Sequence, residues 1–264
     1  MELYEVSDKK STFDFEWVSD KIICSKLLSG FKNVLHGTTT KLFNPNFRSK
    51  EEDILKLLNY LPHKFDKIVF LDQVHSNNVF ILNDSQGFSA FNKCNENLFE
   101  VPSTDGIIVN QMENVLVVIC TADCLPILLL DPIRKIIGGV HSGWKGTRFR
   151  IIQMAIKKMI SFGAKPEDIL IWIGPSIGVC CYEVGDELIK DFKYEFKDWR
   201  DINKGRNLDL KRLNFLQALE SGIKEENIEV SDFCTLCNKE IFHSYRSNGE
   251  KAGRILSFIA LLIS

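Results

Sequence analysis

The chain has 264 residues, of which 45% are hydrophobic and 26% are charged, a balance typical of ordinary globular proteins and not of disordered or fibrous ones. Its 33 Lys and Arg residues are offset by 35 Asp and Glu residues, for a formal net charge of -2. The chain therefore lacks the basic excess that favours nucleic-acid binding.

The first segment, MELYEVSDKKSTFDFEWVSDK, is polar and acidic, without the basic region and apolar run of a secretory signal. The apolar stretches VLVVIC, LPILLL and ILSFIALLIS are all well below the roughly 20 residues needed to cross a bilayer. We therefore predict a cytoplasmic protein that binds neither membranes nor nucleic acid. In that setting its eight cysteines are expected to be free thiols or metal ligands, not a disulfide scaffold.

Residues 1–67 show no clear periodicity, but from Ile68 onward short apolar runs alternate with turns and helical segments, the pattern of mixed α/β layers. Buried strands are predicted at residues 68–71, 79–82, 106–109, 115–120, 126–131, 135–140 and 169–174, and at the C-terminal end.

A helix is predicted from about Thr147 to Gly163, where apolar residues recur at helical spacing. These residues are Ile151, Ala155, Ile156, Met159 and Ile160. Residues 187–223 are predicted to be largely helical. No linker or repeat divides the chain, so one compact unit is expected.

Three polar motifs follow or interrupt predicted strands, at residues 72–76 (DQVHS), 121–124 (TADC) and 141–147 (HSGWKGT). Together they supply two imidazoles and a thiol. Zinc prefers such ligands, and a site with three protein ligands keeps the fourth position open that catalysis requires. Taken singly, each residue has another interpretation. A His at a strand end often only forms a hydrogen bond, and a Cys beside a buried strand packs as a small hydrophobic group.

The third motif also has features of an anion site. His141 precedes two glycines and a predicted helix start, where the backbone can approach a ligand closely and N–H groups favour negative charge. Lys145 adds a positive charge there. The spacing does not match a Walker A loop, so ATP-binding chemistry is not predicted.

Other motifs are less specific. The segment 174–184, GPSIGVCCYEV, follows a strand and is predicted to be a tight loop that forms a wall or lid, or simply a turn. Cys234 and Cys237 have CxxC spacing, but no second CxxC accompanies them, which disfavours a structural zinc. Arg246 and Arg254 can clamp an oxyanion, although exposed surface charge is the simpler interpretation.

The motifs DQVHS, TADCLPILL, VHSGWKGT, IGPSIGVCCYEV and SYRSNGEKAGR occur in this order. They resemble the signature blocks of the YfiH-like, laccase-domain family, from about His36 to near the C-terminus. Formerly described as polyphenol oxidases or copper laccases, these proteins are regarded as purine nucleoside phosphorylases with accompanying adenosine deaminase and methylthioadenosine phosphorylase activity. The resemblance implies a single layered domain, residues 1–264, of α/β (α+β) class, with mixed β-sheets covered by helices.

The resemblance also implies a zinc ion held by His75, Cys124 and His141, with copper a less favoured occupant. It implies purine nucleosides (adenosine, inosine, guanosine or methylthioadenosine) and phosphate as partners of a monomer or small homo-oligomer. Within that frame, Lys145 and Arg246 are candidate phosphate ligands. Asp123 is a candidate for proton handling or for orienting a metal-bound imidazole, with a turn-capping role as the alternative.

One block departs from the family pattern. Lys41 stands where the family usually has Arg, and the glycine pair that usually follows is missing. Because an ammonium lacks the planar fork of a guanidinium, substrate preference at this wall is expected to differ.

Three other functions are considered. A multicopper oxidase is disfavoured, because it requires more than the five histidines of this chain. A cysteine hydrolase would use Cys124 as nucleophile, activated by His141 or His75. A non-enzymatic protein would use the zinc only to tie strands together, but no obvious fourth protein ligand closes the site as a structural zinc site requires.

Overall fold

The computed structural model describes residues 20–44, 48–83, 87–197 and 199–262. The N-terminal segment that we analysed for a secretory signal lies almost entirely outside these ranges. Within them, no helix is both long enough and apolar enough to span a bilayer.

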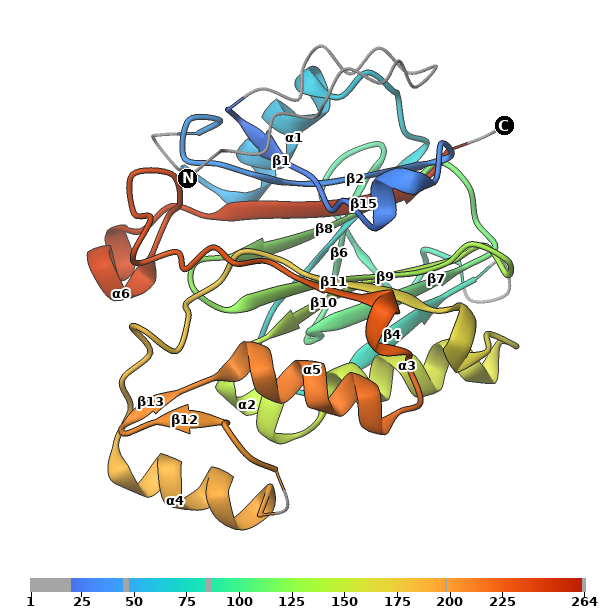
Figure 1. The fold of residues 1–264 in the computed structure, drawn as a ribbon. Coiled ribbons are helices and arrows are strands. Elements are labelled where there is room, and N and C mark those ends of the chain that lie inside the picture. The colour runs from blue at the N-terminus through green and yellow to red at the C-terminus, as the bar shows by residue number, and fades with distance from the viewer. Residues whose placement is uncertain (1–19, 45–47, 84–86, 198, 263–264) are drawn as a thin grey trace.

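Two mixed β-sheets pack face to face at the centre of the fold (Figure 1). The seven-stranded sheet has the order β1 (Ile22–Ile23), β2 (Val34–Thr39), β15 (Ile255–Leu261), β8 (Val115–Thr121), β3 (Lys67–Leu71), β6 (Leu98–Val101) and β5 (Asn92–Lys93). The six-stranded sheet has the order β14 (Ile228–Val230), β11 (Leu170–Ile173), β9 (Leu125–Asp131), β10 (Ile136–Ser142), β7 (Gly106–Asn110) and β4 (Val79–Leu82).

Helices cover the outer faces of both sheets (Figure 1). Helix α1 (Lys50–Tyr60) packs on the seven-stranded sheet, whereas α3 (Ile151–Ser161) and α5 (Leu210–Glu220) pack on the six-stranded one. The shorter α2 (Trp144–Arg148), α4 (Asp186–Glu195) and α6 (Tyr245–Asn248) lie at the periphery, together with the hairpin of β12 (Asn203–Lys204) and β13 (Asn207–Leu208). The predicted class, mixed sheets covered by helices, is confirmed.

Burial on both faces explains why the central strands are continuous apolar runs. In β8, Val117 and Ile119 belong to the core between the sheets, whereas Leu116 and Val118 belong to the core beneath α1. The sheets approach closely at Gly139, where a Cβ atom would lie 2.8 Å from Val117 Cγ1. The sheet cores thus form a rigid frame for the loops that join one sheet to the other.

The predicted strands are all present, as β3, β4, β7, β8, β9, β10, β11 and the C-terminal β15. The prediction of one helix from Thr147 to Gly163 is wrong. The chain forms α2 and α3 instead, because Arg150 adopts a left-handed conformation (φ 59°) between them. Of the apolar residues predicted on that helix, Ile160 is 39% exposed and lies outside the core.

The prediction of residues 187–223 as largely helical holds for α4 and α5 only. Between them, the β12–β13 hairpin turns at Gly205, whose φ of 58° no other residue type adopts as readily.

A pH dependence of stability is expected from His36 on β2. Its ring is buried, with its centroid 6.2 Å from that of Trp172, and Nε2 accepts a hydrogen bond from the Ser25 N–H at 3.1 Å. Burial lowers the pKa of His36 to about 4, from an ordinary value of about 6.5. The folded state therefore binds fewer protons than the unfolded state in this window, so stability is complete above about pH 6.5 and falls toward pH 4, by at most roughly 3 kcal/mol.

Urea unfolding at several pH values between about 4 and 6.5 measures how the free energy of unfolding changes with pH. The variant His36→Gln is expected to show a shallower dependence than the wild type. Parallel slopes for the two proteins would assign the acid sensitivity to other groups.

Candidate metal centre

The three sequence motifs converge at one end of the two sheets. His75 lies in the loop from β3 to β4, and Cys124 in the turn from β8 to β9. Both connections cross from one sheet to the other. His141 lies near the end of β10. The donor atoms of these three residues all lie within 4.8 Å of one another, and the two imidazole rings are nearly perpendicular, with centroids 4.8 Å apart.

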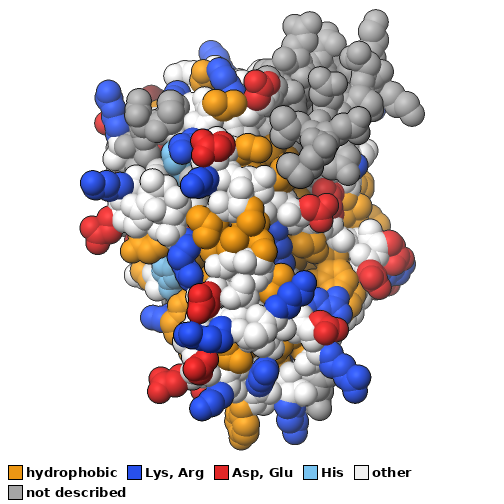
Figure 2. Space-filling view, turned by 60° about the vertical axis from the view of Figure 1, so that its left-hand side comes forward, with side chains coloured by type: hydrophobic (Ala, Val, Ile, Leu, Met, Phe, Trp, Pro, Cys, Tyr) orange, Lys and Arg blue, Asp and Glu red, His pale blue; other side chains and the backbone are white. Residues whose placement is uncertain are grey.

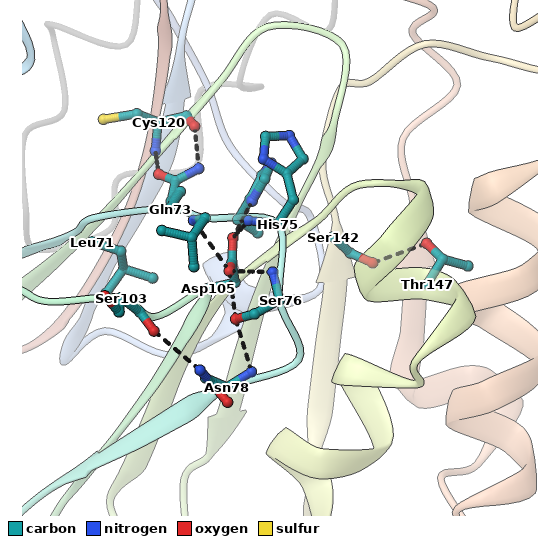
Figure 3. A network of polar contacts seen from close by, with 12 residues as sticks. Leu71, Gln73, His75, Ser76, Asn78, Ser103, Asp105, Cys120, Ser142 and Thr147 are labelled. Atoms are coloured by element: carbon teal, nitrogen blue, oxygen red, sulfur yellow. Dashed lines mark hydrogen bonds and ion pairs between the residues drawn. The ribbon is translucent and has the colours of Figure 1, made fainter.

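A buried carboxylate, Asp105, shapes the loop that carries His75 (Figure 3). It accepts hydrogen bonds from the backbone N–H groups of Val74 (3.3 Å), His75 (3.0 Å) and Ser76 (2.6 Å), and from the Ser76 hydroxyl (2.8 Å). These bonds hold His75 in a left-handed conformation, φ 60°, that a residue with a Cβ rarely adopts. Asp105 therefore determines where this imidazole points.

The same carboxylate orients His141. Asp105 Oδ1 lies 2.7 Å from His141 Nδ1, and the Asp105 carbonyl accepts the His141 backbone N–H at 2.7 Å. With Nδ1 donating to a carboxylate, Nε2 is the nitrogen left to face Cys124 or an ion. Asp105 was not among the residues predicted from the sequence. Its position directly before the strand that begins at Gly106 is a weak signal, because the other three motifs follow or interrupt their strands.

Charge coupling makes Cys124 reactive and His141 basic. Burial alone would raise the pKa of Cys124, but His141, followed by His75, lowers it to about 6. Burial alone would lower the pKa of His141, but Cys124 and Asp105 raise it to about 9. The pKa of Asp105 is held below its usual range because hydrogen bonds from His141 and Ser76 outweigh the opposing effect of burial. Both shifts favour the charged forms of the pair, the thiolate of Cys124 and the protonated imidazole of His141.

The cluster fits a zinc ion. One thiolate and two imidazoles are zinc ligands, and an oriented second nitrogen on a ligating His is the usual supporting contact. Gly143 keeps the space between them open, because a Cβ atom there would lie 3.2 Å from Cys124 Sγ and 3.1 Å from His75 Cδ2. His141 is buried but His75 is exposed, so a small molecule can approach from the His75 side.

The other three histidines do not join this cluster. His36 bonds to Ser25, His63 Nε2 lies 2.9 Å from Asn114 Oδ1, and His243 Nε2 lies 2.8 Å from the Asn44 carbonyl oxygen. The five histidines of the chain therefore do not assemble a set of copper centres.

Asp123 precedes Cys124 and has a left-handed backbone, φ 86°. Its buried carboxylate accepts hydrogen bonds from Thr235 Oγ1 (2.5 Å), Ser244 Oγ (3.1 Å) and the Arg246 backbone N–H (2.6 Å). Asp123 thus fastens the segment 235–246 beside Cys124, whereas the carboxylate that contacts the His141 imidazole is Asp105.

The two predicted cationic groups lie on separate elements. Lys145 is exposed on α2, with Nζ 5.5 Å from the centre of a Trp144 ring. The Arg246 guanidinium lies 5.4 Å from the Tyr182 ring centre and donates a hydrogen bond from Nη2 to the Glu183 carbonyl at 3.0 Å.

A buried network fixes the turn after His141 against α5. Thr147 Oγ1 lies 3.0 Å from Ser142 Oγ (Figure 3) and accepts a bond from Asn214 Nδ2 at 2.9 Å, while Gln217 Nε2 donates to the Thr147 carbonyl at 2.7 Å. The position of α2 relative to the candidate metal centre is therefore set by these buried contacts.

Comparisons of sequence and of structure with known proteins indicate the same family. A sequence profile for the family described as multi-copper polyphenol oxidoreductase laccase matches residues 49–262. Purine nucleoside phosphorylase YlmD of Bacillus subtilis is 32% identical over 263 residues, which covers 93% of this chain and 92% of the relative. Adenosine deaminase RL5, from an unknown prokaryotic organism, is 30% identical over 78% of this chain and 79% of its own length. The crystal structure of the Bacillus licheniformis protein YfiH matches with a TM-score of 0.77 and 30% identity, covering 92% of this chain and 97% of that one.

Proposed function

Because this chain belongs to the multi-copper polyphenol oxidoreductase laccase family, we propose that it is a zinc-dependent purine nucleoside phosphorylase. Its substrates would be adenosine, inosine, guanosine or methylthioadenosine, which phosphate converts to free base and the 1-phosphate of the sugar. Adenosine deamination would be an accompanying activity. The proposal includes the cytoplasmic location predicted above.

The observation that carries the proposal is the convergence of His75, Cys124 and His141 on one point, in a chain related along most of its length to a protein named purine nucleoside phosphorylase. These three residues would hold the ion, and Asp105 would keep His141 in the orientation that offers Nε2. When bound, zinc would supply Lewis acidity at its open fourth position.

Phosphorolysis forms a bond between a phosphate oxygen and C1′ of the sugar and breaks the bond from C1′ to the purine. The protein must therefore bring an anion and an aromatic base together. Arg246 has five N–H donors in its guanidinium, so it can hold the Glu183 carbonyl and still present donors to a phosphate. Lys145 would contribute a mobile positive charge from the turn after His141.

Figure 2 brings toward the viewer the side of the molecule on which α6 lies, and there apolar side chains gather near the middle with Lys and Arg side chains around them, interspersed with Asp and Glu. Asp123 would act by position, since it holds the backbone of Arg246.

A cysteine hydrolase is the alternative that one observation favours. The pKa of Cys124 is lowered to about 6 by its imidazole neighbours, which is the environment of a nucleophilic thiolate. The two functions differ in what zinc does, because zinc would support phosphorolysis but would occupy the thiolate that a hydrolase needs.

Zinc-loaded wild type, incubated with inosine, adenosine or methylthioadenosine with and without phosphate, is expected to release free base and sugar 1-phosphate only when phosphate is present. Cys124→Ala is expected to lose zinc and more than about 100-fold in turnover, because a ligand matters more than the supporting contacts. Chromatography identifies the products. Cys94→Ala, at an exposed cysteine elsewhere, is the matched control. If zinc-loaded wild type turned over none of these nucleosides, the phosphorylase proposal would be wrong, and thiol alkylation blocked by zinc would then test the hydrolase.

A further inference from the structure

Four cysteines outside the candidate metal centre meet in space. Cys180 and Cys181 come from the loop after β11, and Cys234 and Cys237 come from the segment after β14. Their four sulfur atoms all lie within 4.8 Å of one another. Cys237 Sγ is 3.3 Å from Cys181 Sγ and 3.5 Å from Cys180 Sγ. We propose that these four thiols form a second metal site, which binds a single zinc ion.

The spacing of the sulfurs suits one tetrahedral ion. A Zn–S bond of about 2.3 Å places the sulfurs of a tetrahedral four-thiolate site about 3.8 Å apart, within the range that the cluster spans. A disulfide would need two sulfurs at about 2.05 Å and would leave the other two thiols unused. Four thiolates in a tetrahedral arrangement favour zinc among the common metals.

The backbone holds the two segments together at this point. Ser176 and Cys234 form a parallel β-bridge, and the Thr235 N–H donates to the Ser176 carbonyl at 3.1 Å. Gly178 permits the close approach, because a Cβ atom there would lie 3.3 Å from both Cys180 Sγ and Cys234 Cβ. The Gly178 N–H donates to Cys234 Sγ at 3.3 Å, a contact of the kind that supports a metal-bound thiolate.

A positive charge lies beside the cluster. Lys211 lines the same cavity as Cys180 and Cys234. Its ammonium is held by the carbonyl groups of Ser231 (2.5 Å) and Phe233 (2.8 Å). Zinc with four thiolates carries net negative charge, which a fixed ammonium nearby offsets.

The position of the cluster suggests what the ion would do. With four protein ligands it would be a closed, structural site. Both of the segments that it would join also contact Asp123, since the Ile177 N–H donates to the Asp123 carbonyl at 2.8 Å and Thr235 Oγ1 donates to its carboxylate. The second ion would therefore hold together the two loops that contact Asp123, next to the candidate metal centre. This structural role is independent of the reaction proposed above.

Metal stoichiometry tests the inference. The full-length protein, purified under reducing conditions and loaded with zinc, is dialysed against metal-free buffer and analysed for zinc by mass spectrometry. We expect about two zinc ions per wild-type chain and about one in each of Cys124→Ala and Cys237→Ser, because each variant removes a ligand of one site only. Cys94→Ser is the matched control and keeps both ions. Cobalt-loaded Cys124→Ala is expected to show the intense sulfur-to-cobalt absorption of a four-thiolate site.

Two results would overturn the inference. One is a zinc-free Cys124→Ala variant, which would confine the metal of the wild type to the first centre. The Cys124→Ala variant keeps all four cysteines of the second site, so its zinc content tests the inference even if Cys237→Ser does not fold. The other is a count of free thiols showing a disulfide in protein isolated without oxygen.

Discussion

Asp105→Asn is expected to weaken zinc binding by about 10–100-fold, the range for loss of a supporting carboxylate, and to lower turnover of inosine in parallel at limiting zinc. The carboxylate accepts bonds from three backbone N–H groups, the Ser76 hydroxyl and His141 Nδ1. An amide has one acceptor oxygen and brings an NH₂ donor. Several of the N–H and O–H groups that now donate to the carboxylate would therefore face the amide NH₂ and lose their acceptor. Each donor left unpaired costs about 1–3 kcal/mol.

Competition with a chromogenic zinc chelator measures this affinity directly. Asp131→Asn is a matched control, because Asp131 is also fully buried, at the opposite end of β9 from Cys124, and only its Oδ1 accepts hydrogen bonds, from the N–H groups of Ile133 and Arg134. The amide NH₂ can take the place of Oδ2, so zinc affinity is expected to stay at the wild-type value. Equal zinc affinity in Asp105→Asn and wild type would show that Asp105 has no part in presenting the ligands.

Asp123→Asn is expected to have the opposite profile, with zinc retained and kcat/KM for phosphorolysis reduced roughly 100-fold, the effect of about 1 Å of misplacement. An amide NH₂ at the position of Oδ2 would face the donors of Ser244 and Arg246. The segment that carries Arg246 would shift, and the KM for phosphate would rise because Arg246 is the proposed phosphate ligand.

Zinc content and the KM for phosphate, measured on the same preparations, separate positioning from metal binding. Ser244→Ala removes only one donor to the carboxylate and is expected to give an intermediate fall in kcat/KM. Loss of zinc from Asp123→Asn would instead assign Asp123 to the orientation of a metal ligand, the role that we considered from its place in the sequence. A wild-type KM for phosphate would exclude the positioning role.

Local pattern predicted the strands well and the helices less well. The strands β8 and β9 are buried on both faces, so their sequences are uninterrupted apolar runs with little ambiguity. The break between α2 and α3 was not predictable in this way, because apolar spacing continues through Arg150 whereas the left-handed backbone there has no signature in hydrophobic periodicity. Similarly, the hairpin at Gly205 interrupts a region that was predicted as largely helical, between α4 and α5.

The residues of the candidate metal centre also differ in whether the sequence predicted them. Chemical type and position at strand ends made three residues recognisable as candidate ligands: His75, Cys124 and His141. The family resemblance then indicated that the three belong to one metal site. Asp105 was not recognised, because a single carboxylate before a strand has no distinctive spacing. Its role comes from five hydrogen bonds to groups about 30 residues away or more.

Periodicity and composition are local properties of the chain, and they identified most of the buried strands from Ile68 onward together with the residue types at their ends. They did not identify β2 or β6. Which strand ends meet depends on the tertiary fold. Cys180 and Cys237, 57 residues apart, contact each other because the β-bridge between Ser176 and Cys234 aligns their two loops. CxxC spacing does not predict this contact, because Cys180 and Cys181 are adjacent in sequence. Convergence of side chains depends on how strands pair and sheets pack, and those contacts lie far beyond the range over which residue spacing carries information.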